Sequence, residues 1–283
     1  MIVKTILVTG ATGKVGSHFV PRLLQREDTV RLLVRRAEQA EAFQKGGAEV
    51  IVGDLSQPES LASAIAGVQI VVHLAAFFRG TDQERIRTTN EDGTLALANV
   101  SLSAGVERFV FTSTSNVYGP GLHGPGREDD PLQPTATYPQ SKVAAEQALL
   151  ELYRIRGLGV RILRLGFVYG EGDPHVHESL PLLRQWHPAK RLHMVHHADV
   201  SQALLRAIAT AGIDGQIYNV ADDAPVSLAE LRRLNGLPEY ADDADTFFKN
   251  PWELILDTLR IRDELGFRPI YPSYYAARDA GAL

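Results

Sequence analysis

Tyr138 and Lys142 stand four residues apart in the segment 138–142, Tyr-Pro-Gln-Ser-Lys. In a helix this spacing puts both side chains on one face, one turn apart. A phenol with its ordinary pKa of about 10 is a poor base near neutral pH, but an adjacent ammonium favours phenolate and lowers that pKa. We therefore expect Tyr138 to exchange a proton with a substrate oxygen, with Lys142 as the group that tunes it.

A hydroxyl-rich run supports this interpretation. The segment 111–117, Phe-Thr-Ser-Thr-Ser-Asn-Val, ends an apolar, β-branched stretch that is typical of a buried strand. Open α/β sheets bind ligands at the carboxyl ends of their strands, where a hydroxyl can hydrogen-bond a reacting carbonyl or carbinol. Several of these polar residues are also explained by ordinary turn chemistry.

The segment 9–16, Thr-Gly-Ala-Thr-Gly-Lys-Val-Gly, follows the first predicted strand and opens a helix. Gly10 suits a tight turn, Gly13 a close approach of backbone to a pyrophosphate, and Gly16 close packing of the helix on the strand. Glycines that serve packing alone are the alternative. The strand before and the helix after them favour a dinucleotide site.

The end of the second predicted strand bears on which dinucleotide binds. It carries Arg35 and Arg36 where a site selective for NAD usually places an acid against the ribose 2′-hydroxyl. Two guanidinium groups suit a 2′-phosphate, so NADP is favoured and NAD stays possible, unless these arginines only end a solvated strand. Asp54, after the third strand, suits either the adenine amino group or the N-cap of the next helix.

Short apolar runs alternate with amphipathic stretches over the first two thirds of the chain, which predicts a Rossmann doubly wound parallel sheet. After about residue 170 the alternation weakens, although 200–211 and 228–234 have helical patterns. We predict a dinucleotide-binding domain at 1–170 and a smaller substrate-binding lobe at 171–283, with some interleaving. Strands are predicted at 2–9, 29–35, 48–52, 68–74, 107–113 and 160–165, and helices at 14–26, 37–45, 58–66, 82–104 and 137–156.

The composition excludes several classes of protein. The 283 residues are 45% hydrophobic with a formal charge of −5, so the basic excess of a nucleic-acid binder is missing. The absence of cysteine removes disulfide scaffolds and thiolate chemistry and makes the cytoplasm the expected compartment. We find neither a signal peptide nor an apolar run long enough to span a membrane.

These motifs together make the sequence resemble the extended short-chain dehydrogenases/reductases, also called the NAD-dependent epimerase/dehydratase family. The resemblance covers nearly the whole chain. It is carried by TGATGKVG at 9–16, GDL at 53–55, HLAA at 73–76, Asn90 with Gly93-Thr94, STSNVYG at 113–119, YPQSK at 138–142, RLGFVYG at 164–170, VHHADV at 195–200 and YNVA at 218–221.

The resemblance implies a role for each motif. Tyr138 would be the acid/base, Lys142 would also bind the nicotinamide ribose, and Thr114, in preference to Ser113 or Ser115, would be the catalytic hydroxyl. For Asn90, the alternative to a cofactor contact is a structural hydrogen bond. A homodimer through 82–104 and 137–156 is also implied. The expected cofactor contacts are Gly10, Thr12, Gly13, Lys14, Val15, Gly16, Arg35, Arg36, Asp54, Leu55, Leu74, Ala75, Ala76, Asn90, Thr112, Tyr138, Lys142, Leu165, Phe167 and Val168.

Departures from the family pattern bear on the reaction. Family dehydratases carry Asp-Glu where this chain has Ser115-Asn116, so dehydration is not expected. The segment 188–194 lacks the glycine-containing loop that usually precedes VHHADV in sugar-nucleotide epimerases, although Lys190 or Arg191 could replace its arginine contact. Three hypotheses stay open: a reductase that exchanges NADPH freely, a sugar-nucleotide epimerase that retains NAD, and a non-catalytic NADP-binding redox sensor. The intact Thr114, Tyr138 and Lys142 argue against the sensor.

Two polar clusters have plainer explanations. Six of the nine histidines lie between His175 and His197, but a polar loop followed by a helix capped by Asp199 is favoured over a metal site, and we predict no metal. The acids at 128–130 are expected to form a solvated loop. A paired-carboxylate site is their alternative, because they lie between Thr114 and Tyr138.

Overall fold

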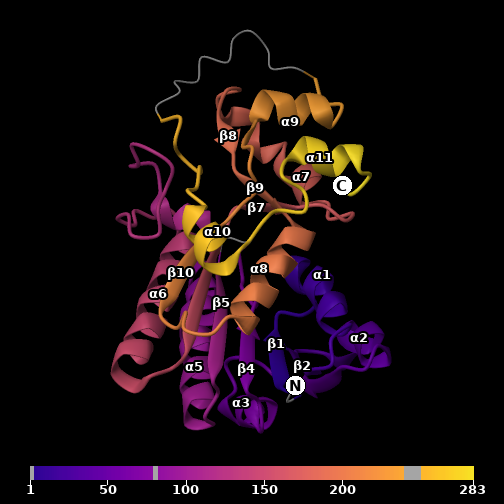
Figure 1. Cartoon of the computed structure of the whole chain (residues 1–283), viewed down its shortest axis with the longest axis vertical. Coiled ribbons are helices and arrows are strands. Elements are labelled where there is room, and N and C mark those ends of the chain that lie inside the picture. Colours follow the sequence, from indigo (N-terminus) through magenta and orange to yellow (C-terminus); the bar gives the residue numbers. More distant parts are fainter. Residues whose placement is uncertain (1–2, 79–81, 239–249) are drawn as a thin grey trace.

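A seven-stranded parallel sheet forms the centre of the computed structural model, which describes residues 3–78, 82–238 and 250–283. The strand order is β10-β6-β5-β4-β1-β2-β3, and the strands stand in the lower half of Figure 1. Their bounds are β1 Thr5–Thr9, β2 Thr29–Val34, β3 Glu49–Val52, β4 Ile70–His73, β5 Arg108–Thr114, β6 Val160–Leu165 and β10 Gln216–Val220. The predicted doubly wound fold is confirmed.

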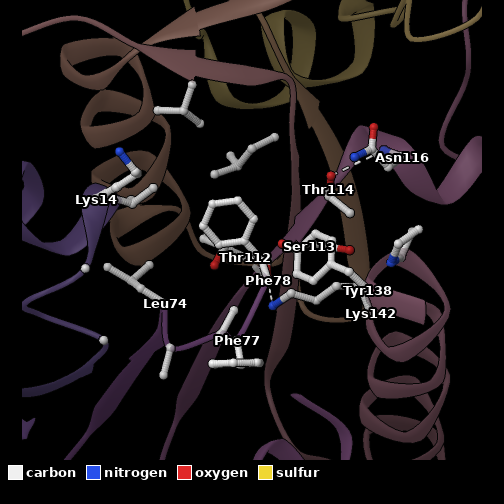
Figure 2. A pocket seen from close by; sticks show the side chains of 18 of the residues that line it. Lys14, Leu74, Phe77, Phe78, Thr112, Ser113, Thr114, Asn116, Tyr138 and Lys142 are labelled. Atoms are coloured by element: carbon white, nitrogen blue, oxygen red, sulfur yellow. Dashed lines mark hydrogen bonds between the residues drawn. The ribbon is translucent and has the colours of Figure 1, made fainter. Parts of the chain in front are cut away.

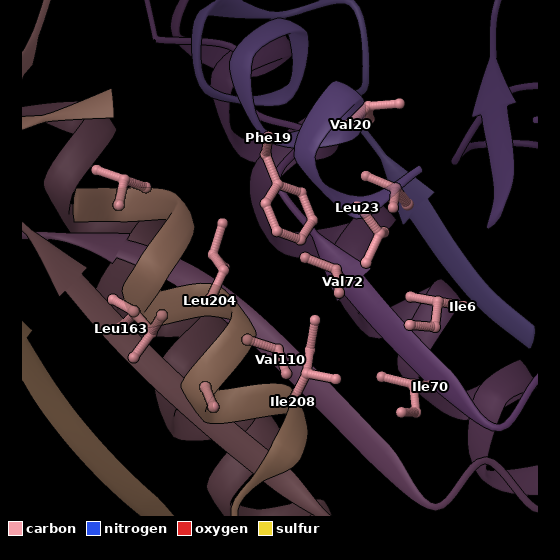
Figure 3. Packing of buried hydrophobic residues seen from close by; sticks show 14 of the residues in the cluster. Ile6, Phe19, Val20, Leu23, Ile70, Val72, Val110, Leu163, Leu204 and Ile208 are labelled. Carbon is pink, nitrogen blue, oxygen red and sulfur yellow. The ribbon is translucent and has the colours of Figure 1, made fainter. Parts of the chain in front are cut away.

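Helices cover both faces of this sheet, which is why its strands are runs of Val, Ile and Leu. On one face α1 (Lys14–Leu23) lies beside α8 (His197–Ala209). Figure 3 shows Phe19 of α1 and Leu204 of α8 packed against Val72 and Val110 of the sheet. The other face is covered by α3 (Pro58–Ile65), α5 (Gly93–Ser103) and α6 (Thr137–Arg156).

A smaller lobe sits above the carboxyl ends of the strands (Figure 1). The chain passes between the two parts of the fold more than once. Although α8 and β10 follow residue 170, they return to the large sheet. The lobe contains two small sheets, β7 with β9 and β8 with β11. Its elements are β7 Phe167–Tyr169, α7 His175–Ser179, β8 Arg191–Leu192, β9 Met194–His196, β11 Val226–Ser227, α9 Leu228–Leu234 and α11 Tyr274–Asp279, while α10 Leu259–Leu265 lies against β10.

Two predicted helices are less regular than expected. The helix predicted at 37–45 is a 3₁₀ turn, Ala37–Ala40, followed by the short α2, Glu41–Lys45. The helix predicted at 82–104 is interrupted between α4 (Gln83–Arg87) and α5 by a π-helical turn, Thr88–Asp92. Such single π turns frequently occur at functional sites. Within the described ranges no helix is long and apolar enough to cross a membrane.

Glu128 corrects the prediction of a solvated acidic loop. Its side chain is buried, and its Oε1 accepts a hydrogen bond of 2.8 Å from the backbone N–H of Asn219. Asn219 lies in β10, the edge strand of the sheet, and among the described residues no strand pairs with its outer N–H groups. The buried carboxylate supplies the missing acceptor. Asp129 is exposed as predicted and pairs with Arg260.

The predicted cap of α8 by Asp199 is wrong. His196 is the N-cap residue, and its ring nitrogen accepts a hydrogen bond from Ala198 N–H. Asp199 is fully buried and accepts hydrogen bonds from the backbone N–H groups of Ile270 and Tyr271. It therefore anchors the C-terminal segment to the start of α8, a long-range contact that local sequence does not reveal.

Asp222, just after β10, gives the protein a pH-dependent stability. The side chain is buried, its Oδ1 accepts a hydrogen bond from Ala224 N–H, and burial, reinforced by the nearby Asp223 and Asp199 carboxylates, raises its pKa to about 8. Between 3.8 and about 8 the folded protein holds a proton that the unfolded chain releases. The free energy of unfolding should therefore fall as pH rises through this window.

Asp222→Asn keeps the acceptor oxygen but cannot ionise. We expect thermal unfolding of this variant to depend less on pH and its melting temperature to exceed that of the unmodified protein near pH 8. Asp263→Asn, at an exposed position of α10, is the matched control and should keep the full pH dependence. An unchanged slope in Asp222→Asn would contradict the assignment.

Candidate active site

A cavity of about 1100 Å³ opens at the carboxyl ends of β1, β4 and β5, below the smaller lobe. It lies at the end of β1, where the strand order reverses because β2 and β4 lie on opposite sides of β1, and this is where doubly wound sheets bind ligands. Thr114, Tyr138 and Lys142 line it together. So do all the predicted cofactor contacts except Arg36 and Asn90.

The glycine turn fits a dinucleotide. Gly10 has a left-handed φ of 71°, and a Cβ there would lie 2.5 Å from Ala75 N. A Cβ on Gly16 would lie 2.2 Å from Gly10 O, so only glycine lets α1 start this close to the turn. The N-cap of α1, Gly13, has no side chain that could cap the helix, so the first N–H groups of α1 can bind an anion.

The adenosine end of the expected site is marked by Asp54 and two arginines. Arg35 and Arg85 both line the cavity, and both act on the Asp54 carboxylate. Hydrogen bonds from the backbone and hydroxyl of Ser56, followed by these cations, lower the pKa of Asp54. The alternative that Asp54 caps the next helix is wrong, because Gln57 is the N-cap residue of α3.

Arg36 does not join this cluster. Successive side chains of an extended segment point to opposite sides, so Arg35 faces the cavity and Arg36 is exposed outside it. Arg85 on α4, which was not predicted from the sequence, lines the cavity and Arg36 does not. The Arg85 guanidinium lies 4.5 Å from the ring centroid of Phe77. The approach of Arg85 on α4 to Asp54, which follows β3, leaves no local signal in the sequence.

Asn90 has the structural role that was its alternative. The side chain is buried in the π turn, accepts a hydrogen bond from Phe77 N–H at 2.7 Å and donates to Phe77 O at 2.9 Å. It also donates to Ser141 Oγ at 3.1 Å. Asn90 therefore fixes the segment after β4 relative to the first turn of α6, the turn that carries Tyr138 and Lys142.

Tyr138 and Lys142 come from the first turn and a half of α6, as the spacing predicted. The Lys142 ammonium donates a 2.9 Å hydrogen bond to Thr112 O, drawn as a dashed line in Figure 2. Burial lowers the pKa of Lys142 to about 7, opposed by the Glu146 carboxylate. Burial raises the pKa of Tyr138 above its usual 10.

The predicted lowering of the Tyr138 pKa by Lys142 is therefore wrong for the side chains as they lie. Desolvation disfavours both charged forms, and the lysine is directed to a backbone carbonyl instead of the phenol. The consequence is a Tyr138 that holds its proton near neutral pH.

Thr114 ends β5, and its Oγ1 accepts a hydrogen bond of 3.3 Å from Asn116 N–H. Ser113 and Ser115 also line the cavity, and among the described residues Ser113 Oγ has no hydrogen-bond partner although it is buried. Figure 2 shows Thr114, Ser113 and Tyr138 on the same side of the cavity, across from Lys14. Ser115 and Asn116, the residues in place of Asp-Glu, both face this space.

Lys14 links the glycine turn to the smaller lobe. Its ammonium lies 2.6 Å from Asp173 Oδ1, and the other oxygen of Asp173 lies 3.0 Å from His197 Nε2. The His197 ring stacks on His18 of α1 with centroids 3.9 Å apart. Burial acts to raise the pKa of Asp173, but Lys14 and His197 bring it below the usual value.

The histidines serve separate structural contacts. His193 Nδ1 accepts a hydrogen bond from Leu256 N–H, so its Nε2 carries the proton that bonds Asp222 O. His196 Nε2 donates to Ala282 O at 2.7 Å while its Nδ1 caps α8. Over the described ranges no three His, Asp or Glu side chains gather as metal ligands would.

Comparison with known proteins identifies the family of this chain. The sequence model of the NAD dependent epimerase/dehydratase family matches residues 6–221, which include the glycine turn and the Tyr-Lys pair. The chain belongs to this family. It is therefore an NAD(P)-dependent enzyme of the oxidoreductase or epimerase type, with the fold of the extended short-chain dehydrogenases/reductases.

Individual relatives differ in their reactions. A 4-hydroxy-2-methyl-3-oxo-4-farnesyl-3,4-dihydroquinoline-1-oxide ketoreductase of Stigmatella aurantiaca is 33% identical over 80% of this chain and 71% of its own length. A short-chain dehydrogenase/reductase superfamily protein of Agrobacterium tumefaciens, solved with NAD, is 27% identical with a TM-score of 0.81, covering 98% and 95% of the two chains. A dTDP-glucose 4,6-dehydratase of Streptomyces venezuelae, solved with NAD and TYD, is 26% identical with a TM-score of 0.79, covering 97% of each.

Proposed function

We propose that this enzyme transfers a hydride between NADP(H) and a secondary alcohol or carbonyl centre, with Tyr138 as acid/base. The observation that carries the proposal is that the glycine turn and the three side chains Thr114, Tyr138 and Lys142 line one cavity. The turn would hold the pyrophosphate, Asp54 and Arg35 the adenosine, and Lys142 the nicotinamide ribose.

The side chains of the chain supply the proton chemistry. When bound, the nicotinamide gives or takes a hydride at the reacting carbon. In reduction, the electron pair of the carbonyl π bond moves to oxygen, and that oxygen takes the Tyr138 proton while Thr114 donates a hydrogen bond to it. Oxidation reverses these transfers. Because burial raises the pKa of Tyr138, the phenol is protonated near neutral pH, the form that reduction requires.

NADP is proposed over NAD because of Arg35 and Arg85. Both guanidinium groups line the cavity near Asp54, and the end of β2 carries no acid that would repel a 2′-phosphate. Solved relatives hold NAD, so this preference is a property proposed for the present chain.

Arg35→Ala tests the preference. A charge-assisted hydrogen bond contributes about 1.5–3 kcal/mol, so NADPH should bind about tenfold to a hundredfold more weakly while NADH affinity changes little. Fluorescence titration with each dinucleotide measures this. Arg36→Ala is the matched control, because Arg36 lies outside the cavity, and it should bind both as the unmodified protein does. Equal losses for NADPH and NADH in Arg35→Ala would argue against 2′-phosphate recognition.

A sugar-nucleotide epimerase that retains NAD is the second candidate, favoured by relatives such as the UDP-glucose 4-epimerase of Vibrio cholerae, 29% identical over 81% of this chain. Mass spectrometry of the dinucleotides released from the purified, denatured protein separates the two. A reductase exchanges its cofactor with each turnover, so little should be retained. One NAD per chain would favour the epimerase and contradict the assignment of Arg35.

We also propose that two copies pair through α5 and α6. Leu95 on α5 and Ile155 on α6 are large apolar side chains with 37% and 72% of their surface exposed. Pairing of these helices would cover them. Light scattering should give twice the 31.0 kDa mass of the chain, and a monomer at assay concentration would contradict the pairing.

A further inference from the structure

The part of the cavity around and beyond Tyr138 is walled by rings and aliphatic side chains. We call it the substrate end and define it by six lining residues: Phe78, Phe167, His175, Trp186, Leu192 and Leu254. Phe78 comes from the segment after β4 and the other five come from the smaller lobe, so the cavity places them together although the sequence does not. Phe78 is 40% exposed, a large apolar side chain that faces open space in the cavity.

The ring of Phe78 is close to the rings of both Tyr138 and His175. The Phe78 centroid lies 5.9 Å from that of Tyr138 and 6.0 Å from that of His175. The His175 ring stacks on Phe167 with centroids 4.4 Å apart and an interplanar angle of 16°. Figure 2 shows Phe78 and Tyr138 side by side in the cavity. Such rings offer flat apolar faces and edges, which suit a flat ring system better than a hydroxylated sugar.

The charges at this end do not suit a diphosphate. Among described residues of the segments that form it, the charged side chains that line the cavity are Asp173 and Glu253, both acidic. Asp173 is held by Lys14 and Glu253 by Lys190, with N–O distances of 2.6 and 2.9 Å. An incoming diphosphate would have to displace these carboxylates or lie beside them.

The two cations that could have replaced the missing arginine contact are engaged elsewhere. Lys190 lies over the Trp186 ring, 3.9 Å from its centroid, in addition to its pairing with Glu253. Arg191 donates to Pro251 O and lies 5.8 Å from the Trp252 centroid. Neither side chain lines the cavity.

His193 adds no positive charge. Both ring nitrogens of His193 are bonded to backbone groups in a way that fixes its neutral form, and burial also lowers its pKa to about 4. His175 donates from Nδ1 to Val168 O at 3.2 Å while its ring packs against Phe167. The substrate end is thus largely apolar and aromatic, and the two cations beside it, Lys14 and Lys190, are each paired with a carboxylate.

We propose that the substrate is an uncharged ketone, or the matching secondary alcohol, carried on a flat ring system, and that Phe78 and Trp186 bind its faces. The proposal rests on the proposed function, since it places the carbonyl at Tyr138 and Thr114. Sugar nucleotides are the competing class.

The test uses acenaphthenequinone, a flat neutral diketone, and UDP-glucose as probes of the two classes. Calorimetry on the protein saturated with NADP measures the binding of each. We expect acenaphthenequinone to bind and UDP-glucose neither to bind nor to compete with it. Phe78→Ala and Trp186→Ala should each weaken ketone binding about tenfold, and Phe78→Leu less, because the apolar contact remains while the ring is lost.

Leu182→Ala is the control. Leu182 is 68% exposed in the same region of the lobe and does not line the cavity, so its variant should bind the ketone normally. All variants should keep the NADPH affinity of the unmodified protein, which shows that they fold.

Four outcomes decide the matter. Tighter binding of UDP-glucose than of the ketone, or ketone binding that is indifferent to Phe78 and Trp186, would overturn the substrate class while leaving the proposed hydride transfer intact. Absence of ketone binding would also overturn the proposed substrate class. Ketone binding with the expected variant pattern, but without transfer of deuterium from NADPH deuterated at both C4 positions, would support the substrate class for binding and contradict the proposed function.

Discussion

Tyr138→Phe is expected to bind NADPH as tightly as the unmodified protein and to lose at least about a hundredfold in turnover. General acid catalysis by a positioned side chain contributes roughly 10²–10⁴-fold, and phenylalanine keeps the ring while removing the proton. The ring contact with Phe78 is retained, so the cavity keeps its shape. Steady-state rates with a reducible ketone and a separate NADPH titration measure the two quantities.

The control for this variant is Tyr153→Phe. Tyr153 is also on α6, but it is 36% exposed and remote from the cavity lining. Its turnover should be unchanged. A Tyr138→Phe enzyme that turns over as fast as Tyr153→Phe would remove Tyr138 from the mechanism, and a parallel loss of NADPH affinity would indicate a cofactor contact in place of acid catalysis.

Among the proposed variants, Arg164→Met is expected to lower the free energy of unfolding most. Arg164 and Glu146 are each 2% exposed, and the guanidinium bonds the carboxylate at 2.6 Å through Nη2 and at 3.1 Å through Nε. Nη1 also donates to Tyr118 Oη and to Glu128 O. Removal of the arginine leaves a buried carboxylate without its cation, which costs about 3–5 kcal/mol. Urea unfolding measures the loss.

The double variant Arg164→Met with Glu146→Leu separates loss of the charge pair from loss of packing. Removal of both charges should recover a large part of the lost free energy of unfolding, since the unpaired carboxylate is gone. Lys45→Met breaks the exposed pair with Glu41, whose side chains are 80% and 62% exposed, and should change stability little. If Arg164→Met were as mild as Lys45→Met, the buried pair would not stabilise the junction between α6 and β6.

The sheet and the glycine turn could be predicted because their signals are local. Runs such as Ile6-Leu7-Val8 are buried on both faces of the sheet, and Gly10 and Gly16 sit where a Cβ would collide with the backbone. The seventh strand, β10, was missed. It is a short segment after α8 that pairs with β6 alone in the part of the chain that the structure describes, so its partner lies far away in the sequence.

The substrate end could not be predicted for the same reason. Phe78, Trp186 and Leu254 face one cavity only because the smaller lobe folds over the ends of the strands. Arg85 likewise reaches the Asp54 carboxylate from another layer of the fold. The pKa of Tyr138 was predicted in the wrong direction because spacing reveals a neighbouring ammonium but not burial, and burial is the stronger effect.

Transfer of deuterium to acenaphthenequinone from NADPH that carries two deuterium atoms at C4 of the nicotinamide tests the central claim most directly. Mass spectrometry of the product should find one deuterium on the new carbinol carbon with the unmodified enzyme, and product formation should fall at least about a hundredfold with Tyr138→Phe. A product without deuterium, or one formed at the same rate by Tyr138→Phe, would contradict hydride transfer with Tyr138 as the acid.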